Sequence, residues 1–287
     1  MKTPGKSYGL VSETSTIEET RNPFYKRNLP SNAPLLWLSR GWSDLWKQPA
    51  PSLVYGVGVF LLSALFIWIL FAGGKDYFFL PAMAGFMIVA PLLAAGLYAK
   101  SRALETGNTV TARMMFLVHP ATGTHIFFTG LLLVLLMLLW MRAAVLVYAL
   151  FFGISPFPGF TDVTTMLVTT QTGLAMLLVG SFIGALFAGF AFAVSVFSIP
   201  MLVDRKVDAL TAMGTSVALV WNNLWPMLAW GAIVLALFLV CVATALVGLI
   251  IVFPLLGHAT WHAYRAMSAP PPLTPNVLSS PDRRAVS

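Results

Sequence analysis

The sequence predicts an all-α polytopic membrane protein, with six transmembrane helices arranged as three hairpins and with amphipathic helices on the cytoplasmic surface. Of its 287 residues, 58% are hydrophobic and only 9% are charged. The mean hydropathy is +0.84, far above the range of soluble domains. Residues 209–264 form a run of 56 residues without Lys, Arg, Asp or Glu, and further charge-free runs of 23 to 41 residues precede it.

These runs are long enough to form spanning helices, because a helix needs about 20 apolar residues to cross a hydrocarbon core about 30 Å thick. A β-barrel would show shorter segments that alternate between apolar and polar residues, and no segment of the chain does so. Spanning helices are therefore expected at 52–72, 77–98, 124–142, 170–200, 226–243 and 246–264.

Polar segments flank this apolar region. Residues 1–33 contain three prolines and lack the apolar stretch of a signal peptide, so we expect a disordered cytoplasmic tail. Residues 34–267 are expected to form the six-helix transmembrane domain. Residues 268–287 include a proline-rich stretch typical of polyproline conformation, which predicts a second disordered tail.

An amphipathic helix is expected between the first tail and the first span, flat on the cytoplasmic surface of the membrane. Apolar and polar residues occupy opposite sides at helical spacing. The apolar side has Leu35, Leu38, Trp42, Leu45 and Trp46, and the polar side has Ser39, Arg40, Ser43 and Asp44. Tryptophan prefers the headgroup zone and basic residues attract anionic lipid, so Arg40, Trp42 and Trp46 are predicted lipid contacts.

A second amphipathic helix is expected before the fifth span. Its apolar side has Leu210, Met213, Val217, Val220, Trp221 and Leu224, opposite Thr211, Thr215, Ser216, Asn222 and Asn223. Asp208 is predicted to cap the start, since a carboxylate accepts hydrogen bonds from the exposed N–H groups of a first turn. Trp221 and Trp225 are predicted lipid contacts.

The last two spans are the hardest to separate, because residues 226–264 contain no polar turn. A single helix of that length would measure about 58 Å, which is longer than a bilayer is thick. Two helices also give an even number of spans. Both termini and most basic loops then face the cytoplasm of a bacterium, as the positive-inside rule requires, and only Lys75 and Arg142 lie elsewhere.

The second and sixth spans share a pattern in which a proline is followed by an arginine eleven residues later. The residues are Gly85, Pro91 and Arg102 in the second span, and Gly248, Pro254 and Arg265 in the sixth. The pattern predicts three copies of a unit, an interfacial helix followed by a hairpin, all in the same sense. Chance recurrence of these residues in apolar sequence is the alternative.

Ionisable side chains inside a membrane cost roughly 2.5 to 3.5 kcal/mol on insertion scales, so each is a candidate functional residue. Arg142 ends the third predicted span. It either snorkels to the outer surface, pairs with a residue such as Asp162, or binds a substrate. Asp204 and Arg205, which follow the fourth span, are also candidate functional residues.

His258 and His262 lie four residues apart on one face of the sixth helix. They either make hydrogen bonds at the membrane interface or share a metal or a haem with a third ligand. No motif of a metalloprotease, nucleotide-binding loop or hydrolase accompanies them, so the sequence predicts no enzyme, no cofactor and no metal site. The basic residues are scattered despite the net charge of +7, and no nucleic acid partner is expected.

Four blocks occur in order along the chain: Gly41-Trp-Ser-Asp-Leu-Trp46; Pro91-Leu-Leu-Ala-Ala-Gly-Leu-Tyr98 with Ser101-Arg102; Ser198-Ile-Pro-Met-Leu-Val-Asp-Arg-Lys-Val-Asp-Ala209; and Pro254-Leu-Leu-Gly-His-Ala-Thr-Trp-His-Ala-Tyr-Arg265. Over about residues 35 to 267 the chain thereby resembles the DUF2189 family of bacterial integral membrane proteins. The resemblance implies an inner-membrane protein. Members are sometimes labelled as similar to cytochrome c oxidase subunit I, but a haem-copper oxidase core would need more spans and more histidines than the four present.

The sequence thus predicts a non-enzymatic inner-membrane protein that acts as an accessory, assembly or organising subunit of a membrane complex, such as a respiratory one. Its expected partners are the bilayer, anionic lipid headgroups and another membrane protein. A transporter or channel for a small or hydrophobic solute is one alternative, based on Arg142 and the proline-interrupted helices. A haem or metal redox protein is the other, based on His258 and His262.

Overall fold

The computed structural model describes residues 25–27, 29–116, 123–153 and 159–268, and these form helices without any strand. The helices are α2 (Ala33–Lys47), α3 (Pro49–Ala72), η1 (Asp76–Phe78), α4 (Phe79–Leu93), α5 (Ala95–Glu105), α6 (Ala112–Phe116), α7 (Gly123–Phe152), α8 (Phe160–Thr169), α9 (Gln171–Ser195), α10 (Ser198–Asp204), α11 (Ala209–Asn222), α12 (Leu224–Ala243) and α13 (Leu249–Ser268). The all-α prediction is confirmed. The predicted disordered tails lie mostly outside the described residues.

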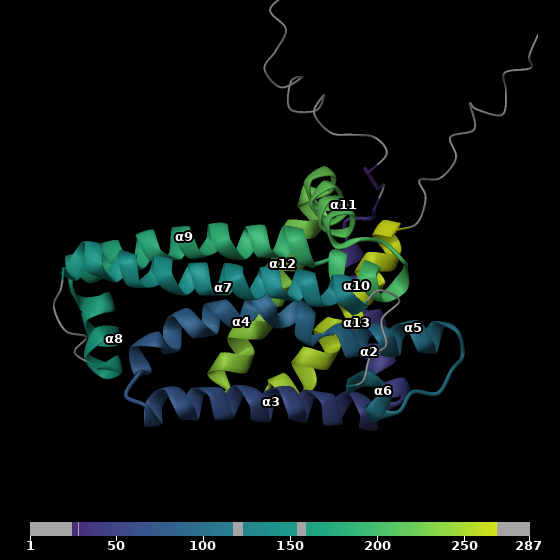
Figure 1. Ribbon diagram of the computed structural model, residues 1–287, viewed down its shortest axis with the longest axis horizontal. Helices are drawn as coiled ribbons and strands as arrows, with labels where there is room; N and C mark the ends of the chain where they lie inside the picture. Colours follow the sequence, from purple (N-terminus) through teal and green to yellow (C-terminus); the bar gives the residue numbers. More distant parts are fainter. Residues whose placement is uncertain (1–24, 28, 117–122, 154–158, 269–287) are drawn as a thin grey trace, which may run out of the picture.

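Most of the long helices run along one axis of the molecule, which is horizontal in Figure 1. α7 and α9 lie side by side along one edge, α3 runs along the opposite edge, and α4 lies between them. η1 and α8 lie at one end of this bundle. At the other end, α2, α5 and α10 pack against α13, and α6 lies beside α3 and α5, while α12 and α13 cross the middle obliquely.

Among the described residues, five segments are long and apolar enough to cross a bilayer: Pro49–Ala72, Asp76–Glu105, Thr124–Phe152, Gln171–Asp204 and Leu224–Ala243. Each overlaps one of the first five predicted spans. The helix predicted at 246–264 exists as α13, but it is not among the five segments, and most of its residues are buried in protein. Its crossing of the membrane stays a prediction.

The division of residues 226–264 into two helices is confirmed. α12 ends at Ala243 and α13 begins at Leu249. The backbone reverses at Ala245 and Leu246, which have positive φ angles of 50° and 66°. Thr244 stabilises the turn, because its Oγ1 accepts a hydrogen bond of 3.1 Å from the backbone N–H of Gly248. The turn lies short of the end where η1 and α8 are found (Figure 1).

The second and third predicted helices extend further than expected. The second is two helices, since α4 contains Pro91, α5 begins at Ala95, and Ala94 separates them. Proline lacks the N–H that an α-helix requires, and helices commonly kink near it. The third helix continues as α7 to Phe152, so the predicted end at Arg142 is wrong. An unbroken apolar stretch after Arg142 lengthens the helix, so that this arginine lies along α7 and not at its end.

The fourth predicted helix is also broken, into α9 and α10. Ser216 of α11 bridges the break, because its hydroxyl accepts from the N–H of Phe197 (3.2 Å) and donates to the carbonyl of Ala193 (2.7 Å). Ser216 was predicted on the polar, outward side of α11, and the structure buries it instead. The predicted cap of α11 is confirmed, since Asp208 accepts a 2.9 Å hydrogen bond from the N–H of Thr211.

The predicted orientation of Asp44 is wrong. This residue was placed on the water-facing side of the first amphipathic helix, but it lies on the face of α2 that packs against α13. Gly41, one turn earlier, allows the close approach: a Cβ atom there would lie 2.6 Å from the backbone nitrogen of Ala259. The contact with a distant helix, rather than the amphipathic pattern, decides which residues of α2 are buried.

Candidate functional site

Six polar side chains from four helices meet where α2, α3, α5 and α13 pack together. They are Asp44, Ser52, Lys100, Ser101, His258 and His262, and we call them the polar cluster. His262 is slightly exposed, and the other five are buried, with four of them at 0% relative exposure. A group of this size and burial needs internal partners for every charge and hydrogen bond.

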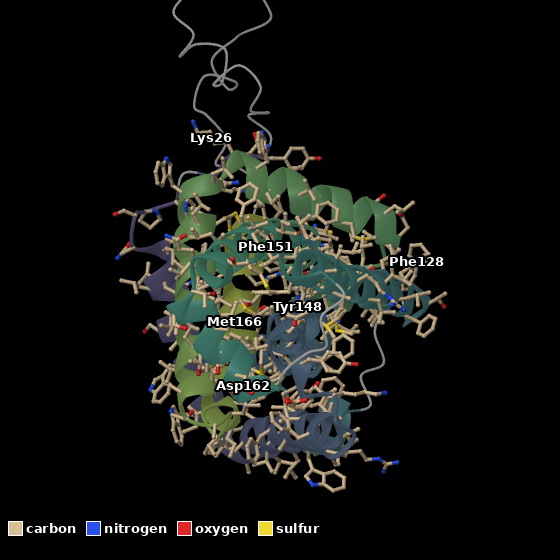
Figure 2. The ribbon with its side chains drawn as sticks, turned by 90° about the vertical axis from the view of Figure 1, so that its left-hand side faces the viewer. Lys26, Phe128, Tyr148, Phe151, Asp162 and Met166 are labelled. Carbon is tan, nitrogen blue, oxygen red and sulfur yellow. The ribbon has the colours of Figure 1, made fainter. Side chains whose placement is uncertain are left out.

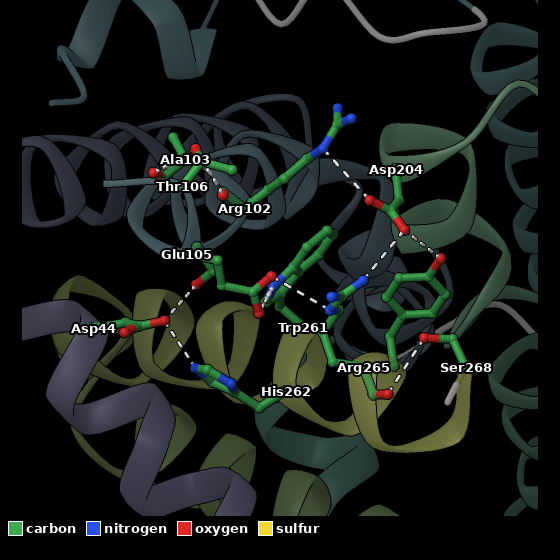
Figure 3. A network of polar contacts seen from close by, with 12 residues as sticks. Asp44, Arg102, Ala103, Glu105, Thr106, Asp204, Trp261, His262, Arg265 and Ser268 are labelled. Carbon is green, nitrogen blue, oxygen red and sulfur yellow. Dashed lines mark hydrogen bonds and ion pairs between the residues drawn. The ribbon is translucent and has the colours of Figure 1, made fainter. Parts of the chain in front are cut away.

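Asp44 is the acceptor at one end of the polar cluster. Its Oδ2 accepts from the hydroxyl of Ser101 (3.0 Å) and lies 2.8 Å from Nε2 of His262. Its Oδ1 lies 3.2 Å from Nζ of Lys47, a residue that is exposed on α2. Figure 3 shows the side chains of Asp44 and His262 directed toward one another.

The imidazole of His258 lies between two serine hydroxyls. Its Nδ1 is 2.8 Å from Oγ of Ser101, and its Nε2 is 2.9 Å from Oγ of Ser52. Because Ser101 gives its only hydrogen to Asp44, it must accept from Nδ1–H of His258. Nε2 is then the acceptor for the hydroxyl of Ser52. These roles make His258 a neutral imidazole with its hydrogen on Nδ1.

Lys100 is the donor at the end of the polar cluster opposite Asp44. Its ammonium donates to the hydroxyl oxygen of Ser52 and to the backbone carbonyl of Gln48, both at 2.6 Å. Gln48 caps the C-terminus of α2, where the carbonyl groups carry partial negative charge. The hydrogen bonds therefore run in one direction, from Lys100 through Ser52, His258 and Ser101 to Asp44. This relay joins two opposite charges that do not touch.

The surroundings of Asp44 predict a pH dependence of stability. Burial alone raises the pKa of its carboxyl, but hydrogen bonding and charge from His262, with hydrogen bonds from Ser101 and Lys47, outweigh burial and lower the pKa from 3.8 to about 2. Since the folded pKa lies below the unfolded one, the stabilisation is complete above about pH 4 and is lost as the pH falls to about 2. The difference corresponds to about 2 kcal/mol.

Unfolding in detergent at pH 5 and at pH 2.5, followed by tryptophan fluorescence, measures this dependence. The wild-type protein is expected to lose more stability between these pH values than Asp44→Asn, which carries no titrating carboxyl at this position. Equal losses in the two proteins would show that Asp44 does not titrate with a lowered pKa.

Next to the polar cluster lies an arginine network, formed by Arg102, Glu105, Asp204, Arg205 and Arg265. Figure 3 labels all of these residues except Arg205. The Asp204 carboxylate lies 3.4 Å from Nε of Arg102 and 3.7 Å from Nη1 of Arg265. Arg265 also pairs with Glu105 at 3.3 Å. The two arginines of the repeat pattern thus share one carboxylate and tie α5 and α13 to α10. Nearly half of each arginine is exposed, so each single pair contributes about 0 to 1 kcal/mol.

Four of the five predicted functional residues belong to these two groups. Asp204 and Arg205 belong to the arginine network, and His258 and His262 belong to the polar cluster. Arg142 belongs to neither. It is exposed on α7, and within the described chain no ion pair joins it to Asp162, which lies on α8 at the far end of the bundle (Figure 2).

The predicted lipid contacts point away from the protein core. Trp42, Trp46, Trp221 and Trp225 have relative exposures between 47% and 81%, and Arg40 is also exposed. An exposed tryptophan suits a membrane interface, because the ring is apolar and its N–H is polar. Contact with lipid stays a prediction for all five residues.

The polar cluster contains a pair that could in principle react. Ser52 and His258 are hydrogen-bonded as nucleophile and base are in hydrolases, and Ser101 connects the imidazole to a carboxylate. Ser52 and His258 are, however, fully buried, and the hydroxyl oxygen of Ser52 already accepts from Lys100. A substrate has no access to this serine in the folded arrangement, so the cluster joins helices.

The part of the chain that the structure describes offers no set of ligands for a metal ion. No group of three His, Cys, Asp or Glu side chains is placed to hold an ion there. Both ring nitrogens of His258 face serine hydroxyls, and Nε2 of His262 faces Asp44. The predicted alternative of a shared metal or haem would require these hydrogen bonds to break.

A stretch that begins with the first residue of α4 and ends with the last residue of α10 matches a protein-family model. Residues 79–204 match DUF2189, a family of predicted integral membrane proteins. The resemblance deduced from the sequence is confirmed over this stretch. The DUF2189 region supplies Lys100 and Ser101 to the polar cluster, whereas α2, α3 and α13 supply the rest. The search of curated proteins and the search of solved structures found no match.

Proposed function

We propose that this protein is a non-enzymatic organising subunit of an inner-membrane complex and that it holds a partner membrane protein against α9. The exposure of this helix is the observation that supports the proposal. In an apolar stretch of 18 residues within the segment Gln171–Asp204, only 6% is buried, compared with 17% to 22% in the corresponding stretches of the other four segments. This segment therefore has the smallest buried share of the five.

The exposed residues of α9 form a regular ridge. Leu178, Phe182, Leu186 and Phe190 recur every four positions, and all are more than half exposed. Rows of side chains at this spacing pack into the grooves of a second helix. A transmembrane helix of the partner is expected to pack along this ridge.

The arrangement of polar groups supports the non-enzymatic part of the proposal. The polar cluster is enclosed, and its hydrogen bonds are satisfied internally. The breaks in the helices do not support a transporter. Side chains already form hydrogen bonds with the backbone groups near these breaks. Tyr55 donates to the carbonyl of Leu93 at 2.6 Å, and Ser216 bridges the break before α10.

The proposal includes three hairpins, with α13 as a protein-enclosed sixth membrane segment and with both termini in the cytoplasm of a bacterium. It is supported by the contact between the two ends of the described chain, where Nε of Arg27 donates to the carbonyl of Met267 at 2.9 Å. The arginine network lies on the last turns of α13 as well, at the end expected to face the cytoplasm. α2 and α11 then lie at this surface, with their exposed tryptophans among lipid headgroups.

Site-specific photocrosslinking in native membranes tests the proposed partner surface. A photoreactive residue at Phe182 or Phe190 is expected to give one protein adduct of a single mass. The matched control is Leu61 on α3, which is 59% exposed but lies off the ridge, and it is expected to give no such adduct. Protein adducts from neither helix, or the same adducts from both, would contradict the proposal. Labelling of Ser52 by a fluorophosphonate would contradict its non-enzymatic part.

A further inference from the structure

A large apolar cavity lies between α4, α7, α9 and α12, with a volume of about 1180 Å³. Each of the four helices contributes lining residues, among them Pro81, Trp140, Gly184 and Leu228 in this order. It lies on the other side of α9 from the proposed partner ridge, whose four residues do not line it. The cavity is therefore independent of the proposed partner surface.

We propose that this cavity binds the acyl chains of one acidic phospholipid, with the headgroup at the junction of α11 and α12. The lining of the cavity is almost entirely apolar, as acyl chains require. Flexible hydrocarbon chains can follow an irregular space between helices.

Aromatic residues mark the two ends of the cavity. Tyr77 and Tyr148 line it near η1 and α8, and Trp221 lines it near the start of α12. Figure 2 views the molecule from the α8 end, where Tyr148 lies close to that helix. Tyrosine and tryptophan prefer the two interfaces of a membrane. Their positions indicate that the cavity extends from one interface toward the other, as a lipid-filled groove would.

The charges at the two ends differ. At the α11–α12 junction, Asn223 accepts from the backbone N–H of Arg27 (2.8 Å) and donates to the carbonyl of Tyr25 (2.9 Å). These bonds hold the exposed Lys26 beside a junction whose neighbours Trp221 and Leu224 line the cavity. A cation at that position attracts an acidic headgroup.

The end of the cavity near η1 and α8 carries a net negative charge. Asp76 directly precedes Tyr77, and Asp162 directly precedes Val163, another lining residue. With Lys75 as the neighbouring cation, the net charge of these three side chains is −1. An acidic headgroup is repelled at this end, so the lipid is expected to enter in one orientation.

One glycine provides a way to fill part of the cavity without disturbing the fold. Gly231 lines it, and a Cβ atom there would have no neighbour within 4 Å. A leucine side chain at this position therefore enters space that we assign to the lipid. Gly214 of α11 is equally open but does not line the cavity, which makes Gly214→Leu the matched control.

Native mass spectrometry of the full chain, stripped of lipid in detergent and titrated with phosphatidylglycerol or phosphatidylcholine, tests the proposal. Wild-type protein and Gly214→Leu are expected to bind one phosphatidylglycerol several-fold more tightly than Gly231→Leu. Lys26→Gln is expected to keep binding but to lose several-fold preference for phosphatidylglycerol over phosphatidylcholine. Equal melting temperatures of the variants confirm that their folds are intact.

Three results would overturn the proposal. If Gly231→Leu bound as tightly as wild type, the cavity would not be the binding site. Equal wild-type affinity for the two lipids would remove the acidic headgroup. A partner helix that occupies the cavity in the isolated complex, found as crosslinks from Gly231 substituted by a photoreactive residue, would replace lipid with protein.

Discussion

Replacing Asp44 with alanine is expected to lower the free energy of unfolding by about 3 to 5 kcal/mol, the usual cost of removing one partner of a buried charge pair. The substitution leaves Ser101 and His262 without their acceptor. It also removes the carboxylate that balances the buried ammonium of Lys100 through the relay. Chemical unfolding in detergent micelles, followed by tryptophan fluorescence, measures the loss.

Two further variants separate the relay from a general effect of removing a carboxylate. Asp208→Ala deletes an exposed carboxylate that only caps α11, so its loss is expected to be much smaller. In Asp44→Ala/Lys100→Met both charges are gone, and part of the lost stability is expected to return because no charge remains buried alone. Lys100→Met alone completes the cycle. If the loss in the double variant equals the sum of the losses in Asp44→Ala and Lys100→Met, then Lys100 and Asp44 are not coupled.

The substitution Gly41→Val is expected to cost at least about 3 kcal/mol, at the upper end of overpacking penalties. At this position a Cβ atom would lie 2.6 Å from the backbone nitrogen and 2.8 Å from the Cα of Ala259. Backbone atoms cannot rotate away, so α2 must move from α13. Asp44 is one turn further along α2, and its hydrogen bond to His262 is expected to break with this movement.

Gly214→Val supplies the control for Gly41→Val. Both glycines lie inside helices at the same end of the molecule, and the helix propensity of valine changes by the same amount at each. A Cβ atom at Gly214 meets no atom within 4 Å, so only Gly41→Val creates a clash. Equal melting temperatures of the two variants would show that α2 and α13 do not pack this closely.

Much of the fold could be predicted from apolar runs and helix signals alone. Five spans, the division between α12 and α13, and the Asp208 cap all depend on residues close together in sequence. Hydropathy and capping are local properties, so a single sequence reveals them. The boundaries were less accurate, because the apolar residues after Arg142 extend α7 without any signal that stops a helix.

The polar cluster could not be predicted in the same way, because its hydrogen bonds join distant segments. Ser52 and His258 are 206 residues apart, and Lys100 lies beyond the predicted end of the second span at residue 98, although α5 continues past it to Glu105. The amphipathic pattern of α2 indicates a surface helix but not which neighbour covers it. The one available signal was Gly41, three residues before Asp44 on the same face, since small residues mark close helix contacts.

The contact of Asp44 with His262 and the contact of Arg27 with Met267 bring the two ends of the described helices together, and we propose that both ends lie on one face of the membrane. Single cysteines in place of Ser31 and Ser268, in a Cys241→Ala background, measure this directly with an impermeant thiol reagent. Both are expected to react in inverted membrane vesicles and not in intact cells, whereas a cysteine at Lys75 reacts in intact cells. Reaction of Ser31→Cys and Ser268→Cys on opposite faces would contradict the hairpin arrangement.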